Sequence, residues 1–120
     1  MTYSSTLAAG EYLQTNDSLL SDNGEYKLLM QEDCNLVLYK GSTALWDSDT
    51  VRTSQACFLI IQSDGNLVIY LGASPEEQGE AIWNSATQGA TAVYFLNLQN
   101  DGNLVIYEGT ARWSTNTVQA

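Results

Sequence analysis

The sequence predicts an all-β domain built from three similar sheets around a pseudo-threefold axis. A nine-residue motif occurs three times, as QEDCNLVLY (31–39), QSDGNLVIY (62–70) and QNDGNLVIY (99–107). Each copy follows an apolar, strand-like run and precedes one tryptophan. A repeat of about 35 residues cannot bury its own apolar face, so the three copies are expected to share one core. Residues 1–120 are therefore interpreted as a single domain made of three repeats.

The first strand of each repeat is predicted at YKLLM (26–30), CFLII (57–61) and YFLNL (94–98). These runs are rich in β-forming residues, and no helical stripe at i, i+3 and i+4 is present. Asp64-Gly65 and Asp101-Gly102 each fall between two such strands, which is the strongest short-range signal for a hairpin. The motif therefore predicts a turn followed by a returning strand.

The returning strand is expected to have one core face and one outer face, because successive side chains of a strand point to opposite sides. In the middle copy, Leu67 and Ile69 should fill the core, while Asn66, Val68 and Tyr70 should face outward. The tryptophans are interpreted as core anchors rather than as sugar-stacking platforms. They are Trp46, Trp83 and Trp113.

The middle repeat carries an insertion. The distance from motif tyrosine to tryptophan is 7, 13 and 6 residues in the three repeats. The extra residues are best placed in ASPEEQGE (73–80), which contains the only proline and should form an exposed loop. Such a loop could extend or obstruct a site on the middle hairpin.

The charge balance excludes some partners. A formal net charge of −10 disfavours binding to nucleic acid or to an anionic membrane surface. No apolar run approaches the roughly 20 residues needed to span a membrane, so no membrane insertion is expected. The N-terminal residues show no signal peptide, which leaves open a cytosolic chain or one whose leader has been removed.

Two cysteines, Cys34 and Cys57, permit one disulfide worth about 3 kcal/mol on the chain-entropy model. The alternative is a pair of buried thiols. The cysteines lie at what read as equivalent edges of neighbouring repeats, which favours the disulfide and an oxidising, secreted, vacuolar or extracellular location. Cys34 stands where the other turns have glycine, which suggests that its φ need not be positive or that the disulfide holds some strain.

The outer face of each hairpin collects Gln, Asp, Asn and Tyr around one valine. Carboxylates accept hydrogen bonds, amides donate and accept, and phenols do either, so the set suits the neighbouring hydroxyls of a sugar. The valine should contact a C–H patch of the sugar ring. Asp and Asn alone could simply stabilise turns, but this would not explain the repeated Gln and Tyr. The candidate residues are Gln31, Asp33, Asn35, Val37, Tyr39, Gln62, Asp64, Asn66, Val68, Tyr70, Gln99, Asp101, Asn103, Val105 and Tyr107.

The threefold QxDxNxVxY motif resembles the mannose-binding motif of the monocot bulb-type lectins, the snowdrop agglutinin family. The resemblance extends over TLAAGEYL (6–13), MQEDCNLVLY (30–39), the cysteine pair and RWSTNT (112–117). It implies a β-prism II fold of three four-stranded antiparallel sheets and mannose binding without metal or other cofactor. It also implies a homodimer, formed by exchange of the C-terminal strand, or a higher oligomer.

The resemblance also implies a role for each motif position. The glutamines would bond O3 of mannose, the Asp and Asn pairs would hold its axial O2, the tyrosines would bond O4, and the valines would pack on C3 and C4. The function implied is that of a non-catalytic, multivalent lectin that binds terminal mannose or high-mannose glycans in defence or glycan recognition.

Three other functions fit the sequence less well. A glycosidase needs two carboxyl groups in different environments, whereas each motif supplies one Asp, and the chain has no His. A calcium module is disfavoured because no EF-hand string is present. A prism kept only for protein–protein contacts would not need three intact motifs.

Overall fold

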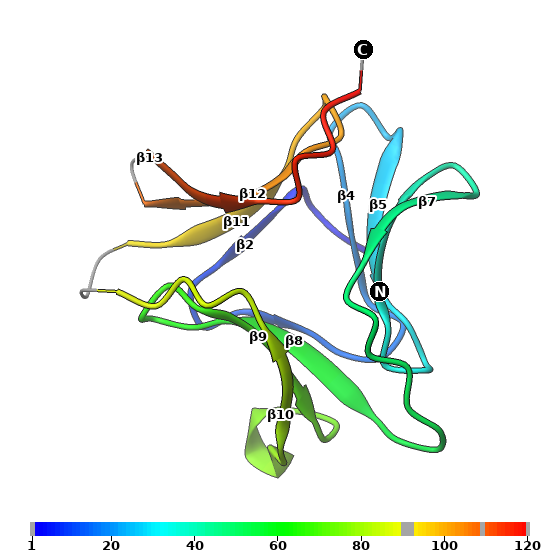
Figure 1. Cartoon of the computed structure of the whole chain (residues 1–120), viewed down its shortest axis with the longest axis vertical. Coiled ribbons are helices and arrows are strands. Elements are labelled where there is room, and N and C mark those ends of the chain that lie inside the picture. The colour runs from blue at the N-terminus through cyan, green and yellow to red at the C-terminus, as the bar shows by residue number, and fades with distance from the viewer. Residues whose placement is uncertain (1, 90–92, 109, 120) are drawn as a thin grey trace.

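The computed structural model describes residues 2–89, 93–108 and 110–119, whose strands form three sheets around a central axis (Figure 1). The first sheet has the order β1-β4-β5-β6-β7. Its strands are β1 (Thr2–Tyr3), β4 (Ser18–Leu20), β5 (Tyr26–Met30), β6 (Leu36–Lys40) and β7 (Thr43–Asp47). All pairings are antiparallel except that of β1 with β4.

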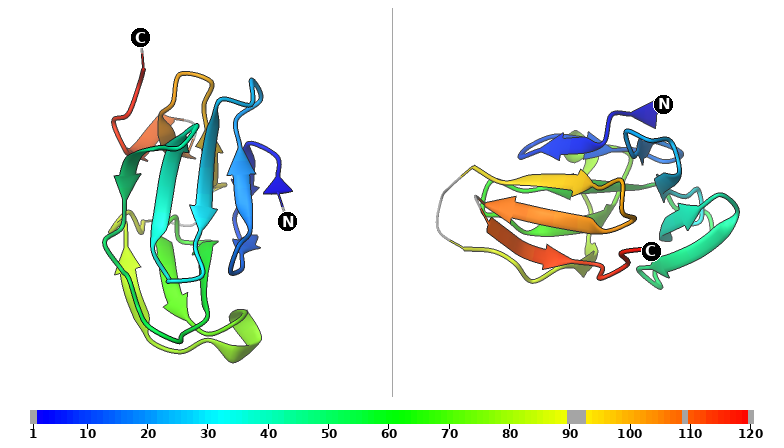
Figure 2. Two further views of the ribbon diagram at one scale, coloured as in Figure 1. Left: turned by 90° about the vertical axis from the view of Figure 1, so that its right-hand side faces the viewer. Right: turned by 90° about the horizontal axis from the view of Figure 1, so that it is seen from above.

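The second and third sheets have the orders β10-β9-β8-β3 and β13-β12-β11-β2 and are fully antiparallel. The second contains β3 (Tyr12–Leu13), β8 (Cys57–Ile61), β9 (Leu67–Leu71) and β10 (Ala81–Asn84). The third contains β2 (Thr6–Ala8), β11 (Phe95–Leu98), β12 (Leu104–Glu108) and β13 (Thr110–Ser114). The three predicted four-stranded antiparallel sheets are confirmed, and β1 is a short parallel addition to the first (Figure 2).

The segment before the first repeat contributes one strand to every sheet. β2 pairs with β11, β3 pairs with β8, and β4 pairs with β5. The repeats themselves supply three strands each, so this segment completes all three sheets. In the right-hand view of Figure 2, the four strands of the third sheet face the viewer in their pairing order.

The core consists of three matching rows of side chains, one across each sheet. The strand registers align Leu19–Leu28–Leu38–Trp46, Leu13–Leu59–Ile69–Trp83 and Leu7–Leu96–Ile106–Trp113. Leu67 and Ile69 are fully buried, which confirms the predicted core face. Burying each Leu or Ile side chain contributes about 1.5–3 kcal/mol.

The three tryptophans meet each other near the axis. Trp46, Trp83 and Trp113 make all three possible edge-to-face pairs, with ring centroids 5.7, 6.0 and 6.0 Å apart. The rings pack against the core cluster but are only partly buried. They act as core anchors, as predicted, at the boundary of the core rather than inside it.

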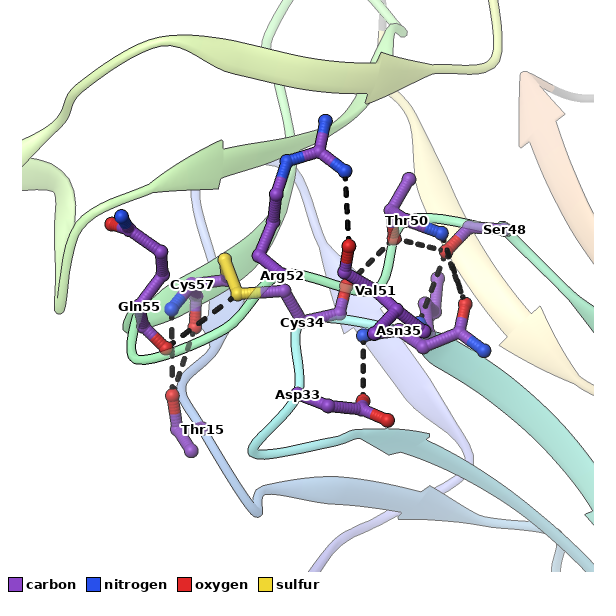
Figure 3. The surroundings of a disulfide bond; sticks show 11 residues. Thr15, Asp33, Cys34, Asn35, Ser48, Thr50, Val51, Arg52, Gln55 and Cys57 are labelled. Carbon is purple, nitrogen blue, oxygen red and sulfur yellow. Dashed lines mark hydrogen bonds between the residues drawn. A yellow bond between two sulfur atoms is a disulfide. The ribbon is translucent and has the colours of Figure 1, made fainter.

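The residue at each motif turn contacts a residue at the start of the first strand segment of another repeat. Gly65 and Gly102 have φ of 87° and 89°, and a Cβ at either position would collide with a tyrosine ring, that of Tyr94 or Tyr26. At the equivalent place in the first turn, Cys34 forms a disulfide with Cys57 (Figure 3). Cys57 and Tyr26 are the first residues of β8 and β5, and Tyr94 directly precedes β11. The disulfide therefore takes the place of a glycine–tyrosine contact.

This arrangement corrects two expectations about the cysteines. Cys34 has a φ of 71°, so the prediction that its φ need not be positive is wrong. The two cysteines also do not occupy equivalent edges, because one lies in a turn and the other begins a strand. The disulfide forms because the turn of one repeat abuts the first strand of the next.

The insertion is an ordered loop between β9 and β10. It contains the 3₁₀ turn η1 (Pro75–Glu77) and is closed by the bonds from Leu71 N–H to Glu80 C=O and from Gly79 N–H to Leu71 C=O, 2.8 and 2.7 Å. Residues 76–80 are exposed, as expected of a loop. Ala81 pairs with Tyr70 as Ala44 pairs with Tyr39, so the insertion leaves the register beside the motif unchanged. Within the described part of the chain, no helix has the length and apolarity to span a bilayer.

Candidate sugar-binding sites

The five predicted residues of each motif lie together on the outer face of one hairpin, and each hairpin belongs to a different sheet. The structure therefore forms three separate sites. Site 1 comprises Gln31, Asp33, Asn35, Val37 and Tyr39; site 2 comprises Gln62, Asp64, Asn66, Val68 and Tyr70; site 3 comprises Gln99, Asp101, Asn103, Val105 and Tyr107.

The motif Gln and Tyr are joined by a hydrogen bond in every site. The Gln amide Nε2 donates to the Tyr hydroxyl at 2.5 Å in sites 1 and 2, and the same bond is present in site 3. This bond fixes the orientation of the amide. The Gln Oε1 is left to accept a hydrogen bond, and the phenol hydrogen is left to be donated.

The motif Asp stabilises its own turn. One carboxylate oxygen accepts a hydrogen bond from the backbone N–H of the motif Asn, at 3.0, 2.9 and 3.0 Å in sites 1 to 3. The turn-stabilising role considered for Asp is thus real. All three Asp side chains are nevertheless exposed, so the second carboxylate oxygen can accept a hydrogen bond from a ligand.

The motif Asn is held through its carbonyl oxygen. In site 2, Asn66 Oδ1 accepts from the hydroxyl of Ser85 and from the backbone N–H of Thr87, both at 3.3 Å. Sites 1 and 3 repeat both bonds, and Figure 3 shows those of site 1 around Asn35. With the oxygen committed to the protein, the amide Nδ2 is the group that can donate outward.

The residues that hold the Asn form a second repeated motif, which was not among the predicted site residues. It reads W-x-[ST]-x-T and occurs at WDSDT (46–50), WNSAT (83–87) and WSTNT (113–117). The last Thr donates to the carbonyl of the turn residue Cys34, Gly65 or Gly102, at 2.6, 2.7 and 2.5 Å. The hydroxyl residues stand two and four positions after each tryptophan, and this constant spacing is the sequence signal that could have identified the motif.

The motif valines point outward, but they are not available as an open contact surface. Val37, Val68 and Val105 are only 4%, 2% and 2% exposed. The Gln–Tyr bond spans the face on which each valine lies, and the adjoining strand adds a neighbour on the same face. The valine therefore forms the floor of the site and is less exposed than a shallow hairpin surface suggests. Its contact with a C–H patch of the sugar ring stays a prediction.

The three sites differ in the residue paired with the motif Tyr. An exposed Lys27 pairs with Tyr39, whereas Phe58 and Phe95 stack on their tyrosines at 5.5 and 5.4 Å. Phe95 is 36% exposed, but Phe58 is fully buried.

Two contacts lie on this side of site 2. Tyr12 lies edge-on to the Phe58 ring at 6.0 Å, and the Gln14 amide donates to the carbonyl of Ala73, at the start of the inserted loop, at 3.0 Å. The insertion is thus fastened near the tyrosine end of site 2. The turn end of the motif keeps the hydrogen bonds found in the other two sites.

The described residues contain no group of three or more His, Cys, Asp or Glu side chains that could hold a metal ion. Each site offers the amides, carboxylate and phenol of its motif as hydrogen-bond donors and acceptors. Such a set can bind a neutral polyol through hydrogen bonds.

Comparison with known proteins identifies similar lectins, although no family profile matches the chain. The chain is 47% identical to a mannose-specific lectin of Galanthus nivalis over 64 residues, which is 53% of this chain and 40% of that protein. The match to a mannose-specific lectin of Narcissus pseudonarcissus covers 52% of that protein. The chain thus spans about half the length, or less, of these curated relatives.

Solved structures of lectins match this chain over nearly their whole length. The snowdrop mannose-specific agglutinin, complexed with methyl-α-D-mannoside, has a TM-score of 0.76 and 43% identity, covering 97% of this chain and 99% of that one. A monomeric monocot mannose-binding lectin from Gastrodia elata has a TM-score of 0.83 and 41% identity, covering 95% and 98%. The fold, the three motifs and this similarity show that the chain belongs to the monocot mannose-binding lectin family.

Proposed function

We propose that the chain is a non-catalytic, multivalent lectin that binds terminal mannose or high-mannose glycans. The observation that carries this proposal is the hydrogen-bond frame repeated in all three sites. In each, the protein fixes the orientation of the Gln and Asn amides by bonding one end of each. The names of the relatives, which are mannose-specific lectins, support the choice of sugar.

Each site offers a defined set of partners to a sugar. The Asn Nδ2 and the Tyr hydroxyl donate, while the Gln Oε1 and the free Asp oxygen accept. A sugar hydroxyl donates one hydrogen bond and accepts others, so a hydroxyl between Asp and Asn is bonded in both senses. We assign this place to the axial O2 of mannose, with O3 toward Gln and O4 toward Tyr.

Multivalency compensates for the weakness of a single shallow site. Such a site is expected to bind a monosaccharide with a Kd on the order of millimolar, or about −4 kcal/mol. Linked sites can raise the overall affinity about 10²- to 10⁴-fold when a ligand reaches more than one of them. The three sites lie on three different sheets, so they suit a branched or clustered glycan surface.

The proposed assembly is a homodimer formed by exchange of the C-terminal strand, or a higher oligomer. Support comes from the position of β13, an edge strand that pairs with the rest of its sheet only through β12. Within one chain β13 completes its own sheet, so a monomer is the competing state. Light scattering coupled to size-exclusion chromatography distinguishes the two, and a monomeric mass would refute the proposed dimer.

We further propose that the protein works in an oxidising compartment, secreted or vacuolar, where it recognises foreign glycans. The Cys34–Cys57 disulfide supports this location, because such bonds persist in oxidising environments.

A glycan array with mannose competition tests the binding proposal, and an assay of sugar release from a mannobioside tests the absence of catalysis. We expect binding to mannose-terminated glycans that free mannose competes away and EDTA does not affect. No release of mannose is expected. Absence of binding to every mannose-terminated glycan on the array would refute the proposal. Measurable release of mannose would refute the non-catalytic claim.

A further inference from the structure

The surface beside the motif glutamine differs between sites 1 and 2. In the first sheet the Asn16 N–H donates to the carbonyl of Met30, just before Gln31. In the second sheet the Gly10 N–H donates to the carbonyl of Ile61, just before Gln62. Asn16 and Gly10 therefore occupy equivalent places, and both have positive φ, 70° and 90°.

The two residues leave different amounts of space. The Asn16 side chain donates to Glu32 at 3.3 Å and so occupies the surface next to Gln31. Gly10 has no side chain, and a Cβ built there would meet nothing within 4 Å. Site 2 is therefore open beside its glutamine, at Gly10.

Gly10 lines two hollows. One, of about 470 Å³, is lined by Gly10, Ile60, Gln62, Ser63 and Asp64, and so includes two of the motif residues of site 2. The other, of about 540 Å³, extends from Gly10 along the N-terminal strands past Glu11, Tyr12 and Gln14. Both volumes fall in the range of small-molecule sites, roughly 300–1,000 Å³.

The second hollow has a composition that suits a neutral sugar. One Glu11 oxygen accepts the Ala8 N–H at 2.7 Å, which holds the carboxylate in place and leaves its other oxygen as an acceptor. The Gln14 amide is held through its Nε2 by Ala73, which leaves its Oε1. Tyr12 is half-buried, with its ring braced by Phe58 at 6.0 Å, and can offer an apolar surface to sugar C–H groups. The carboxylate disfavours an acidic sugar.

We propose that site 2 continues over Gly10 into a second saccharide subsite formed by Glu11, Tyr12 and Gln14. This inference rests on the proposed mannose binding and adds that site 2 binds a neutral, mannose-terminated disaccharide more tightly than a monosaccharide. Site 1 lacks the subsite because Asn16 occupies the equivalent surface.

The test compares methyl α-mannoside with a set of mannobiosides by NMR titration, which reports each site through its own backbone amides. In the unmodified chain, site 2 should bind at least one mannobioside several-fold more tightly than the monosaccharide, and only the disaccharide should shift the amides of Gly10 and Glu11. In Gly10→Asn, which copies the residue of site 1 and tolerates positive φ, the affinity ratio at site 2 should fall to about one.

Gly41→Asn is the matched control, since Gly41 also has positive φ (60°) and open space around it but lies in the β6–β7 turn. It should leave the affinity ratio at site 2 unchanged. The subsite would be refuted if site 2 of the unmodified chain bound the mannobiosides no more tightly than the monosaccharide. It would also be refuted if Gly10→Asn left the preference for the disaccharide unchanged. If methyl α-mannoside itself shifts no motif amide, the proposed function fails, and the subsite fails with it.

Discussion

At the residue scale, the motif Asn separates binding from folding. Its Oδ1 serves the protein through Ser85 and Thr87, while its Nδ2 serves the ligand. Truncation of Asn66 to Ala would remove both functions and would leave a Thr87 N–H without its acceptor, at a cost of about 1–3 kcal/mol. A substitution that keeps the oxygen and changes only the nitrogen is the cleaner test.

Asn66→Asp is expected to abolish sugar binding at site 2 while leaving the fold intact. The new side chain keeps an acceptor for Ser85 and Thr87 but replaces the outward donor with a second acceptor. NMR titration with methyl α-mannoside should show loss of the site 2 response and normal responses at sites 1 and 3.

The adjacent Leu67→Ala is the opposite case, because Leu67 is fully buried in the core. It should cost about 2–5 kcal/mol in the free energy of unfolding, measured by urea denaturation. Comparable unfolding of both variants would contradict the division between the outer and core faces of this strand.

At the scale of the element, the three motif turns pack against a neighbouring repeat in two different ways. Two turns place glycine against a tyrosine ring, and the third places Cys34 against Cys57. In all three, the residue at the turn has positive φ.

This comparison predicts that a glycine–tyrosine contact can replace the disulfide. Cys34→Ser with Cys57→Ser should lose about 3 kcal/mol of stability. Cys34→Gly with Cys57→Tyr should recover part of that loss. Glycine adopts a positive φ without steric cost, and the tyrosine restores the contact between the two sheets. Urea denaturation measures both. A Gly/Tyr variant no more stable than the Ser/Ser variant would show that the glycine–tyrosine contact cannot replace the disulfide.

Hairpins, core faces and the insertion could be predicted from the sequence, because alternation in Leu67–Tyr70 and the Asp-Gly turns are local signals. The paths of β2, β3 and β4 were not predictable, since short strands carry little pattern and their partners lie far along the chain. The burial of Val68 was also missed, because it depends on the bond between Gln62 and Tyr70, which sequence patterns do not record.

At the scale of the whole molecule, the tryptophan triangle couples the three repeats. Each ring comes from a different sheet and contacts the other two. We expect Trp46→Ala to lower the free energy of unfolding by about 3 kcal/mol, somewhat moderated by the partial exposure of the ring.

The double variant Trp46→Ala/Trp83→Ala should lose less than the sum of the two single losses, because the ring pair is already broken by either change. A double-mutant cycle by thermal or urea unfolding measures this coupling. Strict additivity would show that the rings anchor their own sheets independently.

The number of sugar sites per chain most directly tests the central claim, that one hydrogen-bond frame repeated three times forms three mannose sites. NMR titration with methyl α-mannoside should shift the backbone amides of residues 31–39, 62–70 and 99–107 together. Methyl α-glucoside, whose O2 is equatorial, should shift them far less at the same concentration. Absence of shifts in all three motifs, or equal shifts with the glucoside, would contradict the account.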